Sequence, residues 1–339
     1  MLDKDKILHY QIYQNGAVGL CNILMSVENA LIIAKLTNRD KIIFYCPKAL
    51  FNSTTGKTLF DLYDVHFNYE LVRSDLIDDS IESLPYNFHT TCIYYKEYPT
   101  DAFLNGRTQI MDISNYIEKE SFRTINNDTL SFYSYLFYIK DVELLKEIHE
   151  FIRRTVVPKQ QYLSQAHNIL KDIIDVYGEF NSIAVRRGDY MYINDTNNKY
   201  VQVEDFYLDD LAKNVFLLIH TDETDVSYFK TIGIDNYWCI QQSLTNEDVV
   251  EKGLISLIIA SYSTTFIGTL LSTYTSYIQR YRMYNFKNEQ FKFLYSQRQD
   301  LILEKGMIPK GEYSWSNLPD SLRNIAFWIS EYKESYKTK

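Results

Sequence analysis

The feature that most constrains the fold is a regular alternation of short apolar runs and amphipathic segments in the second half of the chain. The apolar runs predict strands over 182–185, 215–219, 237–240 and 265–267, and the segments between them predict helices over 203–213, 246–260 and 272–284. Apolar strands without polar alternation are typical of a parallel sheet that is covered on both faces. We therefore predict an α/β fold whose second domain is a doubly wound parallel sheet.

The first half of the chain opens with a βαβ pattern. A strand is expected over 8–13, a helix follows from Leu20 to Ala34 because its apolar residues recur at helical spacing, and 41–45 is the next strand. Strands joined in this way indicate a second parallel sheet. From Phe51 to Asp141 the pattern is weak, and no order of elements is predicted there.

The boundary between the halves is predicted from two further helices, over 142–156 and 161–177, the second closed by Gly178. A chain of 339 residues is long enough for two domains. We predict Rossmann-like domains over 1–160 and 161–312. The remaining segment, 313–339, contains an amphipathic helix over 320–332 and is a candidate to pack back on the first domain.

Composition excludes several classes of protein. The chain has 35 Lys and Arg residues against 44 Asp and Glu residues, and this net charge of −9 argues against a nucleic-acid partner. Its four cysteines are scattered without a CxxC pair, so neither a zinc site nor a disulfide framework is expected. We expect a cytoplasmic, soluble protein, because no secretory signal and no run long enough for a transmembrane segment is seen.

Polar residues follow three of the apolar strands at the point where each strand ends. The first strand leads into Arg186, Arg187 and Asp189, the second into His220, Thr221 and Asp222, and the third into Gly268, Thr269, Ser272 and Thr273. In open parallel sheets, ligands bind in the crevice outside the carboxyl ends of the strands. Guanidinium groups, hydroxyls and a helix N-terminus near Ser272 together predict an anion site, for which a diphosphate is the natural occupant.

Each of these pieces also has a structural interpretation, as a charged loop, a helix cap or a turn. The spacing of His220 and Asp222 resembles a metal pair, but no third ligand is evident, and we expect no obligatory metal. No G-x-G-x-x-G dinucleotide fingerprint, no G-x-x-x-x-G-K-[ST] loop and no G-x-S-x-G elbow occurs in the chain. The functional prediction therefore rests on the polar groups at the ends of successive strands taken together, and not on any one of them.

The motifs, in this order, resemble those of the GDP-fucose-dependent fucosyltransferase superfamily, which includes protein O-fucosyltransferases, α1,6-fucosyltransferases and nodulation fucosyltransferases. Residues 182–189 resemble its H-x-R-R-x-D segment, 218–223 its A-T-D-D/E segment, and 266–278 its F-x-G-T…S-[ST]-x-[ST] segment. Residues 19–22 are similar to the G-x-x-N opening of the first domain in that family.

The resemblance implies a GT-B architecture, with an acceptor-side first domain and a nucleotide-sugar-binding second domain facing a cleft. It implies metal-independent, inverting transfer of L-fucose from GDP-fucose to a hydroxyl of a glycan or protein acceptor, with no cofactor. Arg186 would bind the β-phosphate, and Asp189 or Asp195 would orient or deprotonate the acceptor. The remaining donor-binding candidates are Asn22, Arg187, His220, Asp222, Thr269, Ser272 and Thr273.

Two departures from the family pattern keep alternatives open. Ala184 stands where the family has a histidine, and an apolar or small residue near Ser256 or Leu257 stands where it has an aspartate. In relatives these two positions help to recognise guanine. The same fold with a different nucleotide sugar, and a catalytically silent nucleotide- or sugar-binding protein, are therefore the two alternatives.

Overall fold

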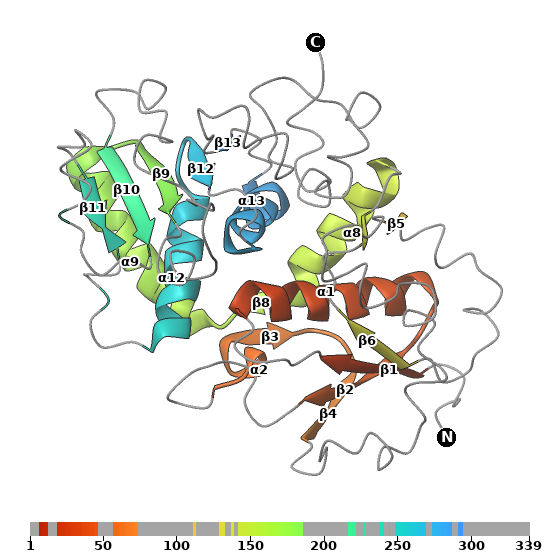
Figure 1. Ribbon diagram of the computed structural model, residues 1–339. Coiled ribbons are helices and arrows are strands. Elements are labelled where there is room, and N and C mark those ends of the chain that lie inside the picture. The colour runs from red at the N-terminus through yellow and green to blue at the C-terminus, as the bar shows by residue number, and fades with distance from the viewer. Residues whose placement is uncertain are drawn as a thin grey trace, which may run out of the picture. The chain divides into compact units, whose positions relative to one another are not determined.

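The computed structural model describes residues 7–12, 19–46, 57–73, 111–112, 129–132, 137–138, 142–185, 216–221, 227, 237–240, 244, 248–268, 273–286 and 291–293. The chain divides into two compact units, Met1–Lys159 and Gln160–Lys339 (Figure 1). Each unit contains its own parallel sheet. The predicted α/β fold with parallel sheets is therefore confirmed.

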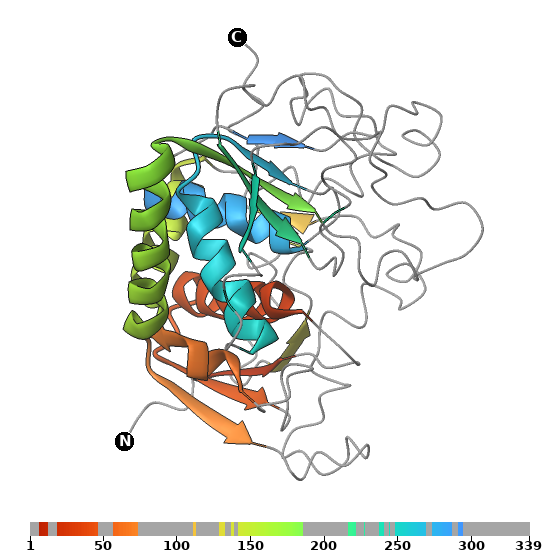
Figure 2. The same ribbon diagram turned by 90° about the vertical axis from the view of Figure 1, so that its left-hand side faces the viewer.

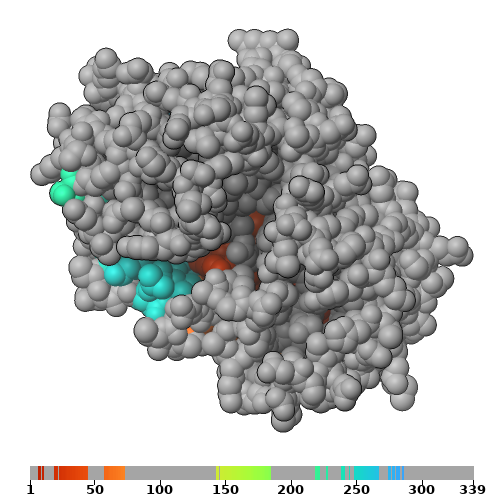
Figure 3. All heavy atoms as spheres, in the orientation of Figure 1, coloured from red at the N-terminus to blue at the C-terminus, as the bar shows by residue number. Residues whose placement is uncertain are grey.

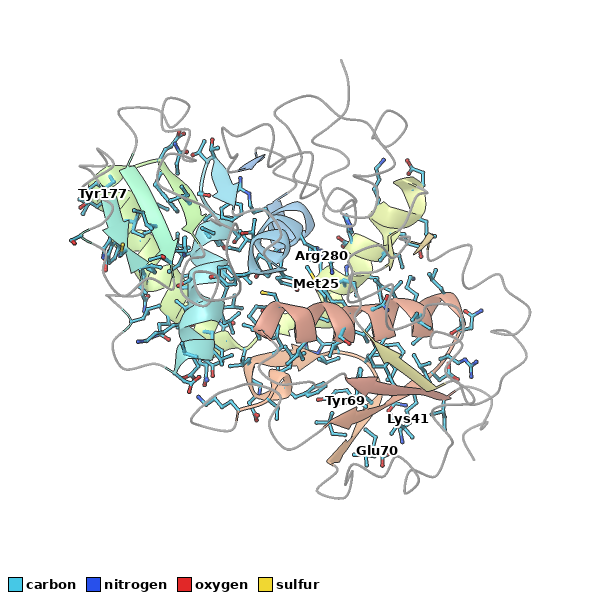
Figure 4. All side chains as sticks on the ribbon, viewed as in Figure 1. Met25, Lys41, Tyr69, Glu70, Tyr177 and Arg280 are labelled. Carbon is cyan, nitrogen blue, oxygen red and sulfur yellow. The ribbon has the colours of Figure 1, made fainter. Side chains whose placement is uncertain are left out.

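The sheet of the first unit contains strands β1 (Ile7–Ile12), β2 (Lys41–Cys46), β4 (Tyr69–Arg73) and β6 (Thr129–Phe132) in the order β4-β2-β1-β6. All three strand pairings are parallel. Helix α1 (Leu20–Leu36) joins β1 to β2, which confirms the predicted βαβ opening. On the neighbouring strands β2 and β4, the ammonium group of Lys41 lies 2.6 Å from the Glu70 carboxylate (Figure 4).

Aromatic side chains form the core between this sheet and its helices. Phe44 contacts the rings of Tyr10, Phe60 and Tyr69, with ring centroids 5.5–6.1 Å apart. Phe60 lies on the short helix α2 (Leu59–Leu62). The Tyr10 hydroxyl is hydrogen-bonded to the Ser26 hydroxyl of α1 at 2.9 Å, so α1 is held on the sheet by a polar contact inside an apolar core.

Two short strand pairs, which the sequence did not order, and the predicted helix over 142–156 complete the first unit. Strand β3 (Tyr63–Val65) pairs antiparallel with β8 (Val156–Pro158), and β5 (Met111–Asp112) pairs with β7 (Phe137–Tyr138). Helix α8 (Val142–Thr155) packs against α1. Across this contact, the ammonium group of Lys35 lies 2.9 Å from the Glu147 carboxylate and over the ring of Phe151.

The second unit has a five-stranded, wholly parallel sheet with the order β11-β10-β9-β12-β13. Its elements in chain order are helix α9 (Gln160–Tyr177), strands β9 (Phe180–Val185), β10 (Phe216–Thr221) and β11 (Tyr237–Cys239), helix α12 (Val249–Ser261), strand β12 (Phe266–Gly268), helix α13 (Thr273–Phe286) and strand β13 (Phe291–Phe293). Helices α9 and α12 run along the same side of this sheet (Figure 2), and α12 also packs against α13.

Local sequence signals explain the ends of these helices. Gly178 closes α9 with a φ of +73°, a left-handed conformation that glycine adopts without steric strain. Asp248 caps α12 by accepting a hydrogen bond from the Val250 backbone at 2.9 Å, and Glu251 completes a capping box. The same Glu251 accepts a 2.7 Å hydrogen bond from the Tyr162 hydroxyl, which fastens the start of α12 to α9.

A buried arginine joins α13 to the end of α12. Arg282 is 0% exposed, and its guanidinium donates to the carbonyl oxygens of Ala260, Ser261, Ser263 and Thr264 at 2.6–3.4 Å. Burial lowers its pKa to about 10, so the group stays charged at neutral pH. The positive charge therefore lies at the negative end of the α12 dipole, where it is stabilised.

Several predicted boundaries change. β10 runs through His220 and Thr221, whereas the prediction ended it at Ile219. α12 begins at Val249 rather than at Asn246, because Asp248 is its cap. The predicted helices over 203–213 and 320–332, and the whole segment 313–339, lie outside the described residues.

None of the described helices combines the length and the apolar character that spanning a bilayer would require. The first turn of α12 reaches the molecular surface, where Val249 is 69% exposed and atoms of the α12 region are visible in cyan (Figure 3).

We predict that Arg282→Met lowers the free energy of unfolding by at least ~3 kcal/mol, because it leaves several buried carbonyl oxygens without their charged donor. Urea denaturation followed by circular dichroism measures the change. Arg154→Met is the matched control, since the Arg154 side chain is 71% exposed in a surface ion pair, and it should change stability by less than ~1 kcal/mol. Equal midpoints for the two variants would contradict the assigned role of Arg282.

Candidate functional site

The strand order of the second sheet defines where a ligand can bind. The chain starts at β9 in the middle of the sheet, proceeds to β10 and β11, and then returns to the other side of β9 with β12 and β13. The direction therefore reverses between β9 and β12. Connections leave the sheet in opposite directions at such a switch point, and a crevice opens there at the carboxyl ends of the strands.

The predicted motifs follow these carboxyl ends directly in the chain. Arg186 follows Val185, the last residue of β9, and Thr269 follows Gly268, the last residue of β12. Asp222 follows Thr221 at the end of the neighbouring strand β10. The covalent structure thus brings the starts of all three polar segments to one edge of the sheet.

The described residues include only part of the predicted site. Seven predicted residues lie outside them: Arg186, Arg187, Asp189, Asp195, Asp222, Thr269 and Ser272. Asn22 and Thr273 are described by their backbone, in the first turn of α1 and at the first position of α13. The roles of all these residues stay predictions.

His220 is the predicted site residue whose side chain is described. It is 2% exposed, and neither ring nitrogen has a hydrogen-bond partner among the residues that the structure describes. Burial lowers the pKa of the imidazole to about 3, so the ring is neutral at physiological pH. A neutral imidazole can donate one hydrogen bond and accept one, which suits a neutral polar group better than a phosphate.

Ser182 is a buried polar residue that reasoning from the sequence did not single out. It is 0% exposed, and within the described part of the chain its hydroxyl has no hydrogen-bond partner. Ser182 lies on β9, two residues before Ala184. A lone serine in an apolar strand is a weak signal in sequence, because only the pairing with β10 reveals what lies beside it.

Helix α13 contributes a second feature of the same edge. It begins at Thr273, after a link of residues 269–272 from the carboxyl end of β12. The first backbone N–H groups of a helix have no partner within the helix, and its dipole favours negative charge at that end. The start of α13 is therefore suited to an anionic group.

The first unit repeats the strand order of the second around its own first strand. In β4-β2-β1-β6 the direction reverses between β1 and β6. Gly19 precedes α1 in an extended conformation, and the first turn of α1 contains Asn22. The family-like G-x-x-N segment thus occupies the start of the helix that follows β1.

No group of three or more His, Cys, Asp and Glu side chains that could hold a metal ion occurs within the described ranges. Cys21 and Cys239, which are described in full, are buried and form no disulfide. Burial raises the pKa of Cys239 to about 11, so this thiol is protonated at neutral pH.

Comparisons with known proteins find similarity in fold and not in sequence. No protein-family model matches the chain, and no characterised protein matches it in sequence. The selenomethionine structure of fucosyltransferase NodZ from Bradyrhizobium matches with a TM-score of 0.50 at 10% identity, over 81% of this chain and 91% of NodZ. The chain therefore shares its fold with a fucosyltransferase, and the resemblance inferred from the motifs is confirmed at that level.

Two further solved structures are similar at lower scores. A variant of FUT1 from Arabidopsis thaliana in complex with GDP has a TM-score of 0.49 at 12% identity, over 81% of this chain and 68% of that protein. POFUT1 in complex with GDP-fucose has a TM-score of 0.45 at 11% identity, over 86% of this chain and 99% of that protein.

The environment of His220 predicts a pH dependence of stability. The folded protein keeps this ring neutral, whereas the unfolded chain protonates it below a pKa of roughly 6.5. The unfolded state thus binds more protons, so the free energy of unfolding falls as the pH drops from about 6.5 towards 3. His220→Asn should make this fall shallower, by up to ~1.4 kcal/mol per pH unit.

Urea denaturation at a series of pH values between 7 and 4 measures that difference in slope. His167→Asn is the matched control, because His167 is exposed on α9 of the same unit. It should keep the wild-type pH dependence. A His220→Asn variant whose stability follows pH as the wild type does would show that the ring is not held neutral.

Proposed function

We propose that the protein is a metal-independent, inverting glycosyltransferase of the GT-B type that transfers L-fucose from GDP-fucose to a hydroxyl of a glycan or protein. The main support is one observation: the family-like motifs follow the carboxyl ends of β9, β10 and β12, at the point where the strand order of a parallel sheet reverses. The fold that the chain shares with NodZ supports it.

The proposed reaction is a single displacement at the anomeric carbon of the sugar. Asp189 or Asp195 takes the proton of the acceptor hydroxyl, whose oxygen forms a bond to C1 of fucose. The bond between C1 and the β-phosphate oxygen breaks, and GDP leaves with the electron pair. Attack from the face opposite to the leaving group inverts the configuration at C1.

Negative charge grows on the diphosphate as that bond breaks, and the proposed donor site is built to accept it. Arg186 contacts the β-phosphate, and Arg187 adds a second positive charge. Thr269, Ser272 and Thr273 donate hydrogen bonds beside the start of α13, while Asn22 and Asp222 contact the donor. Fixed donors aimed at this growing charge stabilise the transition state more than the ground state.

A donor panel tests the proposed function. We expect the protein to hydrolyse or transfer the sugar of GDP-fucose in the presence of EDTA, and to leave UDP-, dTDP- and ADP-sugars unchanged. Release of the nucleoside diphosphate measures turnover. Turnover with a UDP- or dTDP-sugar alone would replace GDP-fucose as the donor, and nucleotide binding without turnover would identify a silent binding protein.

We predict that Arg186→Ala lowers the turnover of GDP-fucose at least ~100-fold, the scale of losing one donor to transition-state charge. Its melting temperature should stay within a few degrees of the wild type, because the role proposed for Arg186 is to bind the donor and not to support the fold. Arg153→Ala, at an exposed position on α8, is the control and should keep full turnover. Wild-type turnover in Arg186→Ala would refute the role of this residue.

A further inference from the structure

Two buried polar side chains of the second sheet have no hydrogen-bond partner within the described ranges. They are His220 on β10 and Ser182 on β9. Nearly all buried polar groups in native proteins are hydrogen-bonded, because leaving one unpaired is unfavourable. Two such groups on adjacent strands therefore call for a specific explanation.

The strand register places the two side chains on the same face of the sheet. His220 pairs with Ala184, and Ala184 follows Ser182 by two residues on the same strand. Paired residues of parallel strands face the same side, as do residues two apart along one strand. From the usual strand spacing and rise per residue, the Cα atoms of Ser182 and His220 lie about 8 Å apart, so one small polar group can reach both.

Small residues lie beside His220 in the direction of the switch point. Gly268 of β12 pairs with Ala184, so a row across three strands reads His220, Ala184 and Gly268. The side chain of Ala184 is a single methyl group, and Gly268 has none, so this row of β9 and β12 carries only small residues. This row is also close to the carboxyl ends, since β9 ends one residue after Ala184 and β12 ends at Gly268.

The two side chains suit a neutral ligand group. The imidazole and the hydroxyl each offer a donor and an acceptor, and neither has a positive charge with which to attract a phosphate. An amide edge of a nucleobase or the hydroxyls of a sugar ring would satisfy both. In the proposed function the diphosphate is bound by Arg186 and the start of α13. The base and the sugar are therefore the parts of the donor that can contact this face of the sheet.

We propose that His220 and Ser182 form a polar subsite that hydrogen-bonds a neutral part of the nucleotide sugar and contributes to the choice of donor. The inference rests on the proposed function and deepens it, by assigning donor selectivity to side chains on the strands themselves. His220 and Ser182 bind in this scheme and take no part in the chemical step.

The test compares His220→Phe and Ser182→Ala with the wild-type protein. Isothermal calorimetry measures the affinities of GDP, UDP, dTDP and ADP, and then of GDP-fucose and inorganic pyrophosphate. We expect each variant to bind the preferred nucleoside diphosphate at least ~10-fold more weakly, the scale of one lost hydrogen bond, with pyrophosphate affinity unchanged. A loss seen with GDP-fucose but not with GDP would place the subsite at the sugar instead of the nucleoside.

Thermal melting separates a binding role from a structural one. If the ring nitrogens of His220 are paired only when a ligand is bound, His220→Phe removes two unpaired buried polar atoms from the unliganded protein. The variant should then melt at or above the wild-type temperature while binding the nucleotide more weakly. His167→Asn and Ser164→Ala, at exposed positions on α9, are matched controls and should bind as the wild type does.

Other outcomes overturn the inference in distinguishable ways. Unchanged nucleotide affinity in both variants, with normal binding by the wild type, rejects the subsite and leaves the proposed function standing. Equal losses for nucleotide and pyrophosphate, together with a lower melting temperature, show that the two residues only support the fold. A wild-type protein that binds none of the nucleotides refutes the proposed function and the subsite together.

Discussion

Burial of a parallel sheet confines its charged groups to the ends of its strands, and the second unit depends on this constraint. Its strands read as apolar runs, which is typical of a parallel sheet that is covered on both faces, so charged groups are placed where the strands stop. The reversal of strand order between β9 and β12 then separates the outgoing connections and leaves room between them. The position of the candidate site follows from the topology, whichever ligand occupies it.

Helix α13 can serve that site only if it is held in place, and Arg282 provides the attachment. Its guanidinium binds the carbonyl oxygens at the end of α12 and the turn that follows, 21 and 19 residues earlier at Ser261 and Ser263. This contact uses backbone groups that the end of a helix leaves unpaired. One buried charge thus satisfies the end of α12 and fixes the helix that follows the carboxyl end of β12 in the chain.

Local signals predicted much of this architecture. Apolar runs located the central strands, Gly178 marked the end of α9, and the polar residues after Val185 and Gly268 pointed to the edge of the sheet. Features that depend on distant partners were missed. β8 forms because Val156–Pro158 pairs with Tyr63–Val65. The role proposed for Ser182 depends on the position of His220 on the neighbouring strand. Neither relation has a local pattern in the chain.

A crystal structure of the protein with GDP tests the central claim most directly. We expect a diphosphate at the carboxyl edge of β9 and β12, with a guanidinium nitrogen of Arg186 about 3 Å from a β-phosphate oxygen and the backbone at the start of α13 donating to the same group. A diphosphate bound elsewhere, or an Arg186 side chain directed away from it, would contradict the account and remove the basis for assigning a nucleotide-sugar donor.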